Sequence, residues 1–308
     1  QYSVEPSNVL PRLGRATFTI PYAWVEEEAH AITLITNTGV TFASEIAVAV
    51  ETPEPSRDLF WRFALIGLYV GVVPVVLGML WYPWMRRLSK QAMNFILSLT
   101  VGLLVFLAIG TYLDAQEFAA TLPAFWQGTP VVILVSLIAL GVLLALGNRS
   151  KTSERKPLGL AYQIALGIGL HNLGEGLAIG AAFAAGEAAL ATFLVLGFTV
   201  HNITEGVGIA APVVRQNPGF KHFAFLALLA GVPAILGTWL GGFAFNPVLA
   251  TLFLAIGVGA ILQVVWEVGK LVAKDSAKFE RPTINWTNLA GFALGVAIMY
   301  FTAFMVKF

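Results

Sequence analysis

Long apolar stretches separated by short polar connections fill the chain from Leu59 onward. Each stretch has about 18 to 26 residues, enough for a helix rising about 1.5 Å per residue to cross a hydrocarbon core of about 30 Å. The pattern therefore predicts an all-α, polytopic membrane protein with eight transmembrane helices. The expected helices cover residues 59–84, 91–113, 130–147, 158–184, 188–212, 222–243, 247–272 and 286–306.

Residues 1–56 have a different pattern. They contain several prolines and two stretches rich in β-branched residues, Ile32–Thr36 and Val40–Val50, on either side of an Asn-Thr-Gly sequence. Two such stretches around a turn of this composition are typical of a β-hairpin. We therefore expect a small β-rich extramembrane segment over residues 1–56, followed by a transmembrane domain over residues 57–308.

Basic residues occur in alternate connections between the expected helices. The connections after the second, fourth and sixth helices contain no Lys or Arg. Basic connections favour the cytoplasmic side of a membrane, so we expect the connections after the first, third, fifth and seventh helices to be cytoplasmic. Both termini should then be extracytoplasmic, which agrees with removal of a signal peptide ahead of Gln1. The basic residues are Arg86, Arg87 and Lys90; Arg149, Lys151, Arg155 and Lys156; Arg215 and Lys221; and Lys270, Lys274, Lys278 and Arg281.

The composition agrees with a membrane protein. Apolar residues make up 57% of the chain and charged residues 11%, with a mean hydropathy of +0.79, whereas a soluble domain has about 25% charged residues. The formal net charge of +1 gives no indication of nucleic-acid binding. Since the chain has no cysteine, disulfides, thiolate ligands and a thiol nucleophile are all excluded.

One short motif occurs twice, as His171–Gly176 (HNLGEG) and His201–Gly206 (HNITEG). On a helix, its His and Glu at i and i+4 share one face. A short connection near Gly186 joins the two helices, so both motifs lie about 22 Å from the turn of an antiparallel hairpin. The sequence thus predicts two imidazoles, two carboxylates and two amides at one depth in the membrane, as in transporters with inverted repeats.

Such a cluster is costly unless its charge is neutralised. Each carboxylate near the middle of a membrane costs about 2.5–3.5 kcal/mol on insertion scales, and two facing carboxylates repel, so one is expected to take up a proton. A divalent cation would cancel both charges, and its binding would release protons. The alternative is a pair of buried His–Glu hydrogen bonds that only tie two helices together; two copies at equal depth favour the metal site.

With these motifs, its eight expected spans and its external termini, the chain resembles the ZIP (Zrt/Irt-like) metal transporters, especially the bacterial branches. The resemblance implies that Glu267 lies near the cytoplasmic exit. It also implies a homodimer in which the first, fourth, fifth and sixth helices move against the other four, like an elevator. The residues that match the family's metal ligands are His171, Glu175, His201 and Glu205 in a primary site, and Asn172 and Asn202, with the same glutamates, in an adjoining one.

The chain departs from the family pattern at several positions. Gly174 and Thr204 stand where relatives usually have proline. Ala234 stands where some relatives have a glutamate of the second site, which puts a two-metal centre in doubt. The second helix lacks the usual His or Glu near its outer end; Asp114 and Glu117 there are either a metal entrance or a solvated helix end.

Together, the residues and the resemblance predict a transporter, not an enzyme, that moves a divalent transition metal toward the cytoplasm across a bacterial inner membrane without a cofactor. Imidazole with carboxylate suits Zn, Fe, Mn, Co or Ni, and the absence of thiolate argues against Cu(I). The expected partners are the metal ion, the lipid bilayer and a second copy of the chain.

Two alternatives stay open at this stage. An intramembrane metallohydrolase would use His171, His201 and a glutamate to activate water, although the chain has no H-E-x-x-H motif and places glycine beside the ligands. A transport-inactive sensor or receptor would act through residues 1–56, and the departures from the family pattern are compatible with it.

Overall fold

The structure, a computed structural model, divides into two compact units. One unit comprises Gln1–Glu54 together with Ala185–Glu187, and the other comprises Pro55–Ala184 and Ala188–Phe308. The described residues are 2–5, 9, 16–25, 28–46, 55–149, 157–186, 188–214, 216, 218–244, 246–278 and 280–306.

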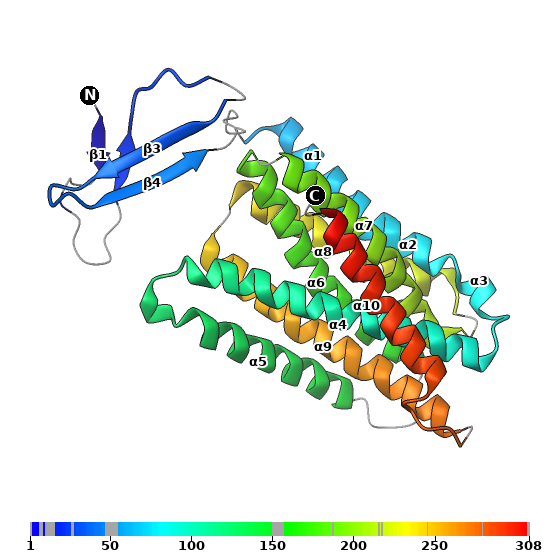
Figure 1. Cartoon of the computed structure of the whole chain (residues 1–308). Helices are drawn as coiled ribbons and strands as arrows, with labels where there is room; N and C mark the ends of the chain where they lie inside the picture. Colours follow the sequence, from blue (N-terminus) through cyan, green and yellow to red (C-terminus); the bar gives the residue numbers. More distant parts are fainter. Residues whose placement is uncertain are drawn as a thin grey trace. The chain divides into compact units, whose positions relative to one another are not determined.

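The first unit contains two antiparallel strand pairs (Figure 1). They are β1 (Ser3–Glu5) with β2 (Thr17–Thr19), and β3 (His30–Ile35) with β4 (Thr41–Ile46). The turn between β3 and β4 contains Gly39, whose φ of +83° lies in the left-handed region that glycine adopts without strain. The predicted hairpin is confirmed, and its last predicted positions, residues 47–50, lie outside the described residues.

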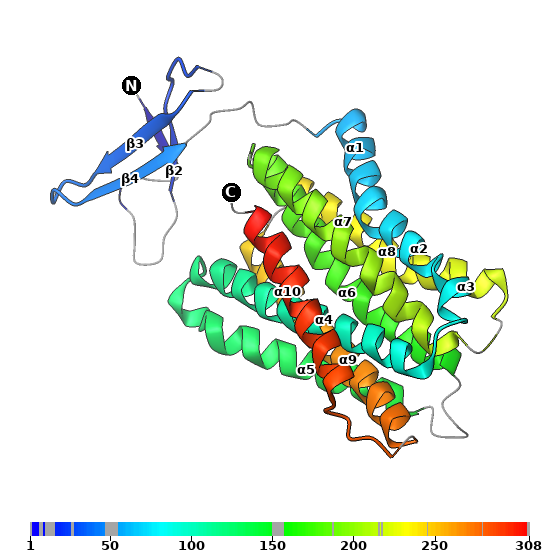
Figure 2. The same cartoon turned by 45° about the vertical axis from the view of Figure 1, so that its right-hand side comes forward.

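The second unit is built from helices (Figures 1 and 2). Among the described residues, seven helical segments are long and apolar enough to span a membrane. The last helix has a shorter apolar part, Trp286–Phe301. The predicted class, an all-α polytopic membrane protein with a small β-rich N-terminal segment, is confirmed. The helices are α1 (Arg57–Gly67), η1 (Leu68–Val72), α2 (Val73–Met79), α3 (Tyr82–Met85), α4 (Lys90–Ala120), η2 (Ala124–Trp126), α5 (Gly128–Arg149), α6 (Pro157–Ala184), α7 (Ala188–Ala210), η3 (Ala211–Val213), α8 (Phe220–Phe243), α9 (Pro247–Ala277) and α10 (Trp286–Val306).

Two helices extend beyond their apolar stretches. α4 continues to Ala120, where the hydropathy predicts an end near residue 113, and α9 continues to Ala277 instead of residue 272. Hydropathy shows where the apolar surface stops, whereas capping and backbone hydrogen bonding decide where a helix stops. Asp114 therefore lies inside a helix and presents its carboxylate on a fixed face of α4.

The α6–α7 hairpin defines the two ends of the helical unit. Its turn contains Gly186, with a φ of +78°. We call the end with this turn the Gly186 end, and the opposite end, where α4 begins, the Lys90 end. The sequence predicts that the Lys90 end is cytoplasmic. Four of the basic residues behind that prediction lie outside the described residues, namely Lys151, Arg155, Lys156 and Arg215.

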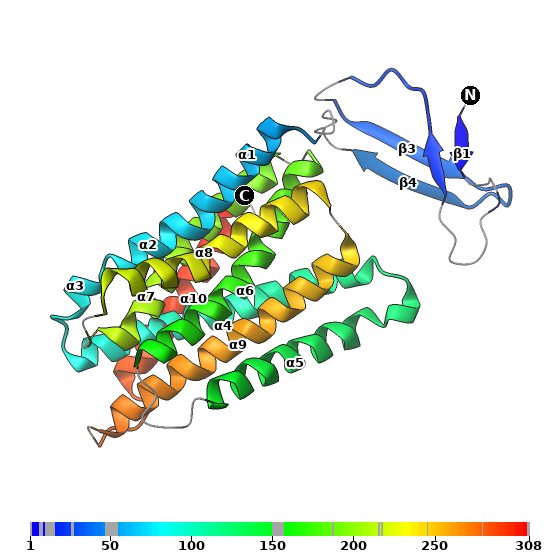
Figure 3. The same cartoon turned by 180° about the vertical axis from the view of Figure 1, so that it is seen from behind.

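The helices pack as two groups. The first group contains α1, η1, α2, α6, α7 and α8, and the second contains α4, α5, α9 and α10. α8 lies between α1 and α6 in the first group, as Figure 3 shows from behind. In the second group, α10 lies across α4 (Figure 2) and α9 lies between α4 and α5. The two groups meet mainly where α6 packs against α9.

Glycine brings helix backbones into direct contact inside each group. A Cβ added at Gly176 of α6 would overlap the carbonyl oxygen of Ala234 in α8, and Gly291 of α10 meets the backbone of α4 in the same way. Between the groups the contact is different, because the nearest neighbour of Gly174 in α6 is the side chain of Leu254 in α9. Small residues thus bring helix backbones together within a group, while between the groups the tightest contact of Gly167 in α6 is with the side chain of Val264 in α9.

Candidate metal site

The two copies of the repeated motif face each other on α6 and α7. His171 and His201 are each 15 residues from Gly186, and both are buried. Glu175 connects them, since its Oε1 accepts a hydrogen bond from His171 Nε2 at 2.9 Å and another from His201 Nε2 at 2.5 Å. The two motifs therefore meet at matching depth, as the geometry of an antiparallel hairpin requires.

Both motif asparagines are held by carbonyl groups of neighbouring helices. Asn202 Nδ2 donates to Val70 O in η1 at 3.0 Å. Pro74, four residues later, has no N–H that could donate to this carbonyl in an α-helical pattern. Asn172 Nδ2 donates to Ala230 O at 3.0 Å, in α8, which also contains an internal proline. The side-chain oxygens of both asparagines stay available for another partner.

Five buried acceptor atoms in the motifs have no hydrogen-bond partner among the described residues. Because His171 Nε2 donates to Glu175, its Nδ1 carries a lone pair and is an acceptor. All five atoms are acceptors, so no rearrangement among them would satisfy any of them, and such groups are rare in proteins unless something binds them. They are His171 Nδ1, Asn172 Oδ1, Asn202 Oδ1, Glu205 Oε1 and Glu205 Oε2.

Three of the motif side chains form a compact cluster suited to a metal ion. His171, His201 and Glu205 each offer one ligand atom, and these atoms lie within 4.8 Å of one another. Imidazole nitrogen with carboxylate oxygen is a ligand set for divalent transition metals. In this conformation Glu175 accepts hydrogen bonds from both imidazole rings. Glu205 offers the free carboxylate.

A cavity reaches this cluster from the Gly186 end. It has a volume of about 150 Å³ and is lined by His171, Glu175 and Asp114, together with apolar side chains of α4, α7, α9 and α10. Asp114, a candidate from the sequence, therefore shares a cavity with two motif side chains. Glu117 is exposed and does not line this cavity.

The cluster is closed on the side of the Lys90 end. Leu103 and Leu104 of α4 pack with Met299 of α10 around Glu205 and leave no space for a water molecule. The main hydrophobic core continues from there toward the Lys90 end, through buried residues of α4, α6 and α9. In this conformation, the cavity of about 150 Å³ and the acidic side chain of Asp114 are on the Gly186 side of the cluster, and an apolar layer without room for a water molecule is on the other.

Two further sequence candidates lie apart from the cluster. Glu267 of α9 is 3% exposed, and its Oε1 accepts a hydrogen bond from Lys270 Nζ at 3.4 Å. Ala234 of α8 is fully buried against α6, so this position adds no oxygen ligand. Sequence reasoning missed Gln263, one helical turn before Glu267. Gln263 is fully buried and neither of its side-chain polar atoms has a partner among the described residues; its only signal in the sequence is a lone amide within an apolar run.

The residues that replace the family's prolines keep both motif helices continuous. Thr204 donates its hydroxyl to His201 O at 2.7 Å, within α7. Gly174 leaves the space that the side chain of Leu254 fills. Neither α6 nor α7 is interrupted at its motif. The histidine and glutamate of each copy therefore keep the i, i+4 spacing that places them on one face.

A comparison with protein families finds one match, to the model described as ZIP zinc transporter. The matched residues are 147–303, just over half of the chain. This region includes both motif helices, α8, α9 and most of α10. A comparison with curated proteins finds no match.

Proposed function

Because the chain belongs to the ZIP zinc transporter family, we propose that it carries divalent transition-metal ions across the membrane toward the cytoplasm, using the cluster on α6 and α7 as its binding site. Membership makes it an integral membrane protein of a metal-transporting family. The identity of the ion, the direction of movement and the binding residues are the proposal.

The set of unpartnered acceptors carries this proposal. With Glu205 ionised, His171, Asn172, Asn202 and Glu205 together present five buried acceptor atoms that have no partner among the described residues. A structural pair of His–Glu hydrogen bonds would leave no such excess. A divalent cation accepts all of these atoms as ligands, whereas one water molecule can donate only two hydrogen bonds.

The proposed primary ligands are His171, His201, Glu175 and Glu205. The two asparagine oxygens, of Asn172 and Asn202, adjoin them as further ligands. In the conformation described here Glu175 accepts three hydrogen bonds, two from the imidazoles and one from Asn202 Nδ2 at 3.2 Å. An arriving ion would replace the imidazole protons in these contacts, so binding should release protons.

The ligand chemistry limits the cargo. Imidazole and carboxylate ligands suit Zn, Fe, Mn, Co and Ni, and the chain contains no cysteine that would favour Cu(I). Aside from this cargo, the proposal requires no cofactor. Exclusion of water from the Lys90 side favours a carrier over a continuous pore, because a pore needs a path open at both ends.

The packing of the helices supports alternating access. Backbone contacts through glycine hold each of the two helix groups together, while the contact between the groups involves side chains. Movement between the groups would therefore disturb fewer close contacts than movement within one. We propose that α1, α6, α7 and α8, with η1 and α2, move as one body and expose the cluster alternately to the Asp114 cavity and to the Lys90 end. Glu267, buried on α9, would meet the ion on its way out.

The remaining proposals concern the orientation of the protein in the membrane, its cellular location and its oligomeric state. The basic connections favour a cytoplasmic Lys90 end, extracytoplasmic termini and residues 1–56 outside the membrane. We propose a bacterial inner membrane as the location and a homodimer as the assembly.

Metal uptake into proteoliposomes tests the function. Purified protein would be reconstituted with a metal-sensitive dye inside the vesicles, and uptake of Zn²⁺ and Mn²⁺ would be followed for wild type, Glu205→Gln and Asp58→Asn. Asp58 is an exposed carboxylate on α1 that pairs with Arg62, so Asp58→Asn is a matched control. We expect a drop in uptake of at least about tenfold in Glu205→Gln, as for loss of a metal ligand, and none in the control.

The same preparation separates the alternatives. Equal uptake by wild type and Glu205→Gln contradicts the proposed site. Metal binding by wild type with no uptake into sealed vesicles favours a sensor or receptor. Consumption of a peptide or ester substrate in detergent, lost in Glu205→Gln, would identify a hydrolase instead.

A further inference from the structure

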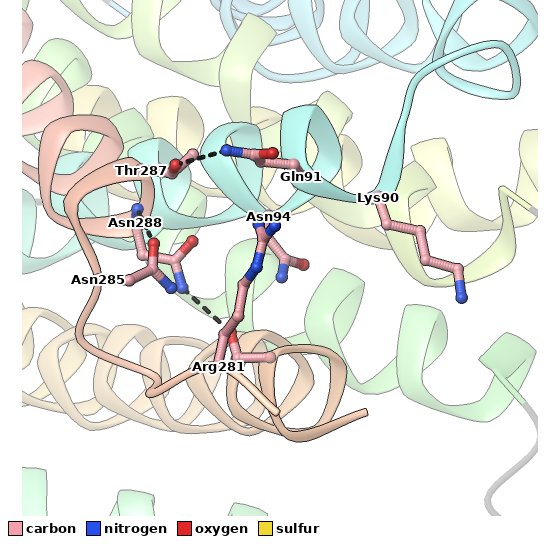
Figure 4. A pocket seen from close by; sticks show the side chains of 8 residues that line it. Lys90, Gln91, Asn94, Arg281, Asn285, Thr287 and Asn288 are labelled. Atoms are coloured by element: carbon pink, nitrogen blue, oxygen red, sulfur yellow. Dashed lines mark hydrogen bonds between the residues drawn. The ribbon is translucent and has the colours of Figure 1, made fainter. Parts of the chain in front are cut away.

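A second polar pocket lies at the Lys90 end, away from the metal cluster (Figure 4). It has a volume of about 170 Å³ and is formed where α4 begins, α9 ends and α10 begins. Every residue that lines it is polar, and none is acidic. The lining residues are Lys90, Gln91, Asn94, Ser276, Arg281, Asn285, Thr287 and Asn288.

Arg281 gives this pocket a positive charge, and none of the residues that line the pocket is acidic. Arg281 has no ion-pair partner among the described residues. Figure 4 shows its side chain extending across the pocket toward Asn94. A guanidinium presents several N–H donors in a fixed plane that matches the oxygens of phosphate or carboxylate. Lys90, which also lines the pocket, adds a second cation.

The hydrogen bonds around the pocket leave two hydroxyl hydrogens without an acceptor among the described residues. Gln91 Nε2 donates to Thr287 Oγ1 at 2.9 Å, and Asn288 Nδ2 donates to Ser276 Oγ at 3.2 Å. Both hydroxyl oxygens thus already accept a hydrogen bond, and their hydrogens have no acceptor among the described residues. Each hydroxyl is therefore a free donor.

Asn94 shows that the polar network of the pocket is incomplete. This side chain is 7% exposed, and its Oδ1 has no hydrogen-bond partner. A guanidinium held in the pocket by an anion would provide that partner, since Arg281 extends toward Asn94 (Figure 4).

The helix ends add to the positive potential. α4, with 31 residues, and α10, with 21, both begin at this pocket. The first N–H groups of a helix carry partial positive charge and favour anions. Trp286, the first residue of α10, is 86% exposed, and exposed tryptophan at a helix end is typical of the membrane–water interface. The pocket is therefore at the depth of lipid headgroups.

We propose that this pocket binds a phosphate group. Arg281 and Lys90 would pair with its charge, and the hydroxyls of Ser276 and Thr287 would donate to its oxygens. The phosphate is either the headgroup of an anionic phospholipid or a soluble phosphate ion. Because α4, α9 and α10 all belong to one helix group, a bound phosphate would fasten that group at the membrane surface without joining it to the other.

Thermal unfolding of the purified full-length protein in detergent tests this site. The probes are a short-chain phosphatidylglycerol, the matching phosphatidylcholine and inorganic phosphate, each titrated against wild type, Arg281→Gln and Arg87→Gln. Arg87 is an exposed arginine in the same connection as Lys90 and lines no described pocket, so Arg87→Gln removes an equal charge from the same surface.

We expect a rise in Tm of several degrees with a saturating phosphate probe in wild type and Arg87→Gln, and at least a tenfold weaker response in Arg281→Gln. Stabilisation by phosphatidylglycerol alone identifies a lipid site, and stabilisation by inorganic phosphate identifies a soluble anion. Arg281→Lys keeps the charge but loses the planar fork, and should bind with intermediate affinity; it serves as the test if Arg281→Gln fails to fold. No stabilisation of wild type by any probe, or equal losses in Arg281→Gln and Arg87→Gln, would overturn the proposal.

Discussion

The two glutamates of the repeated motif should respond in opposite ways to the same substitution. Glu205 is 2% exposed, and neither of its carboxylate oxygens has a hydrogen-bond partner. Glu175 is equally buried but accepts hydrogen bonds from His171, His201 and Asn202. Methionine has a similar length and no strongly polar atom. We therefore expect Glu205→Met to stabilise the metal-free protein and Glu175→Met to destabilise it.

The magnitudes follow from what each substitution removes. A buried polar group without a partner costs about 1–3 kcal/mol, and Glu205 contains two oxygen atoms that have no partner among the described residues. Glu205→Met should thus raise the free energy of unfolding by about 2–3 kcal/mol. Removing Glu175 strands three buried donors, and breaking a buried, hydrogen-bonded pair costs about 3–5 kcal/mol. The two variants should differ by more than about 5 kcal/mol.

Thermal unfolding in detergent, with metal removed by a chelator, measures this difference. At about 2–4 °C for each kcal/mol, Glu205→Met should unfold about 5–10 °C above wild type and Glu175→Met about 10 °C below it. A second set of scans with metal at one hundred times its Kd should stabilise wild type by about 2.7 kcal/mol and should leave both variants unchanged. Glu117→Met, which removes an exposed carboxylate of α4, is the control and should stay within about 0.5 kcal/mol.

Two results would refute this reasoning. A lower Tm for Glu205→Met in chelator would mean that the carboxylate has a stabilising partner in the metal-free protein. Metal stabilisation that persists in Glu205→Met would mean that the ion binds without this carboxylate. Loss of stability in Glu175→Met alone is not sufficient support, because many buried substitutions destabilise a protein; the opposite signs of the two variants carry the test.

Three other outcomes follow from the structure. Asp114→Asn should raise the metal concentration for half-maximal uptake about two- to fivefold at low ionic strength and less in high salt. The reason is that an exposed charge contributes about 0.5–1 kcal/mol and is screened by salt. Equal effects at both salt concentrations would contradict a purely electrostatic role. Since the chain has no cysteine, labelling of introduced thiols can report which positions a water-soluble reagent reaches. Thr111→Cys, in the Asp114 cavity, should react with a hydrophilic reagent, and Thr100→Cys, in the closed layer, should not. Equal labelling of the two variants would show that the layer opens. Gly176→Ala should lower the free energy of unfolding by at least about 1–3 kcal/mol, because the added methyl group overpacks α6 against α8; a lower Tm would show it. Gly141→Ala, at a position with open space, is the control and should leave the Tm unchanged or slightly raised.

The membrane helices and the meeting of the motifs could be predicted because both depend on local rules. An apolar stretch long enough to cross the bilayer has few alternatives to a helix. Once a short turn near Gly186 makes a hairpin, equal distances from that turn place His171 level with His201. The ends of α4 and α9 could not be predicted in the same way, since hydropathy does not register a helix that continues into polar surroundings.

The partners of the motif side chains could not be predicted, because they come from other helices. Asn202 donates to Val70 O, four residues before Pro74, and nothing in the sequence brings this carbonyl next to α7. The sequence does indicate that such a carbonyl exists, since a proline within an apolar helix always leaves one without its usual donor. The phosphate pocket was missed for a related reason: its residues come from three separate segments, and none forms a recognisable motif by itself.

The unequal environments of Glu175 and Glu205 explain how a nearly symmetric sequence can serve a directional process. Without metal, two facing carboxylates cannot share the available donors equally, and Glu175 has all of them. Glu175 also lines the Asp114 cavity, so an arriving ion first meets a carboxylate whose contacts with the imidazoles must be broken. Glu205, next to the closed layer, has no contacts to lose. On the proposed function, binding would therefore become more favourable as the ion moves from Glu175 toward Glu205, in the direction of the Lys90 end.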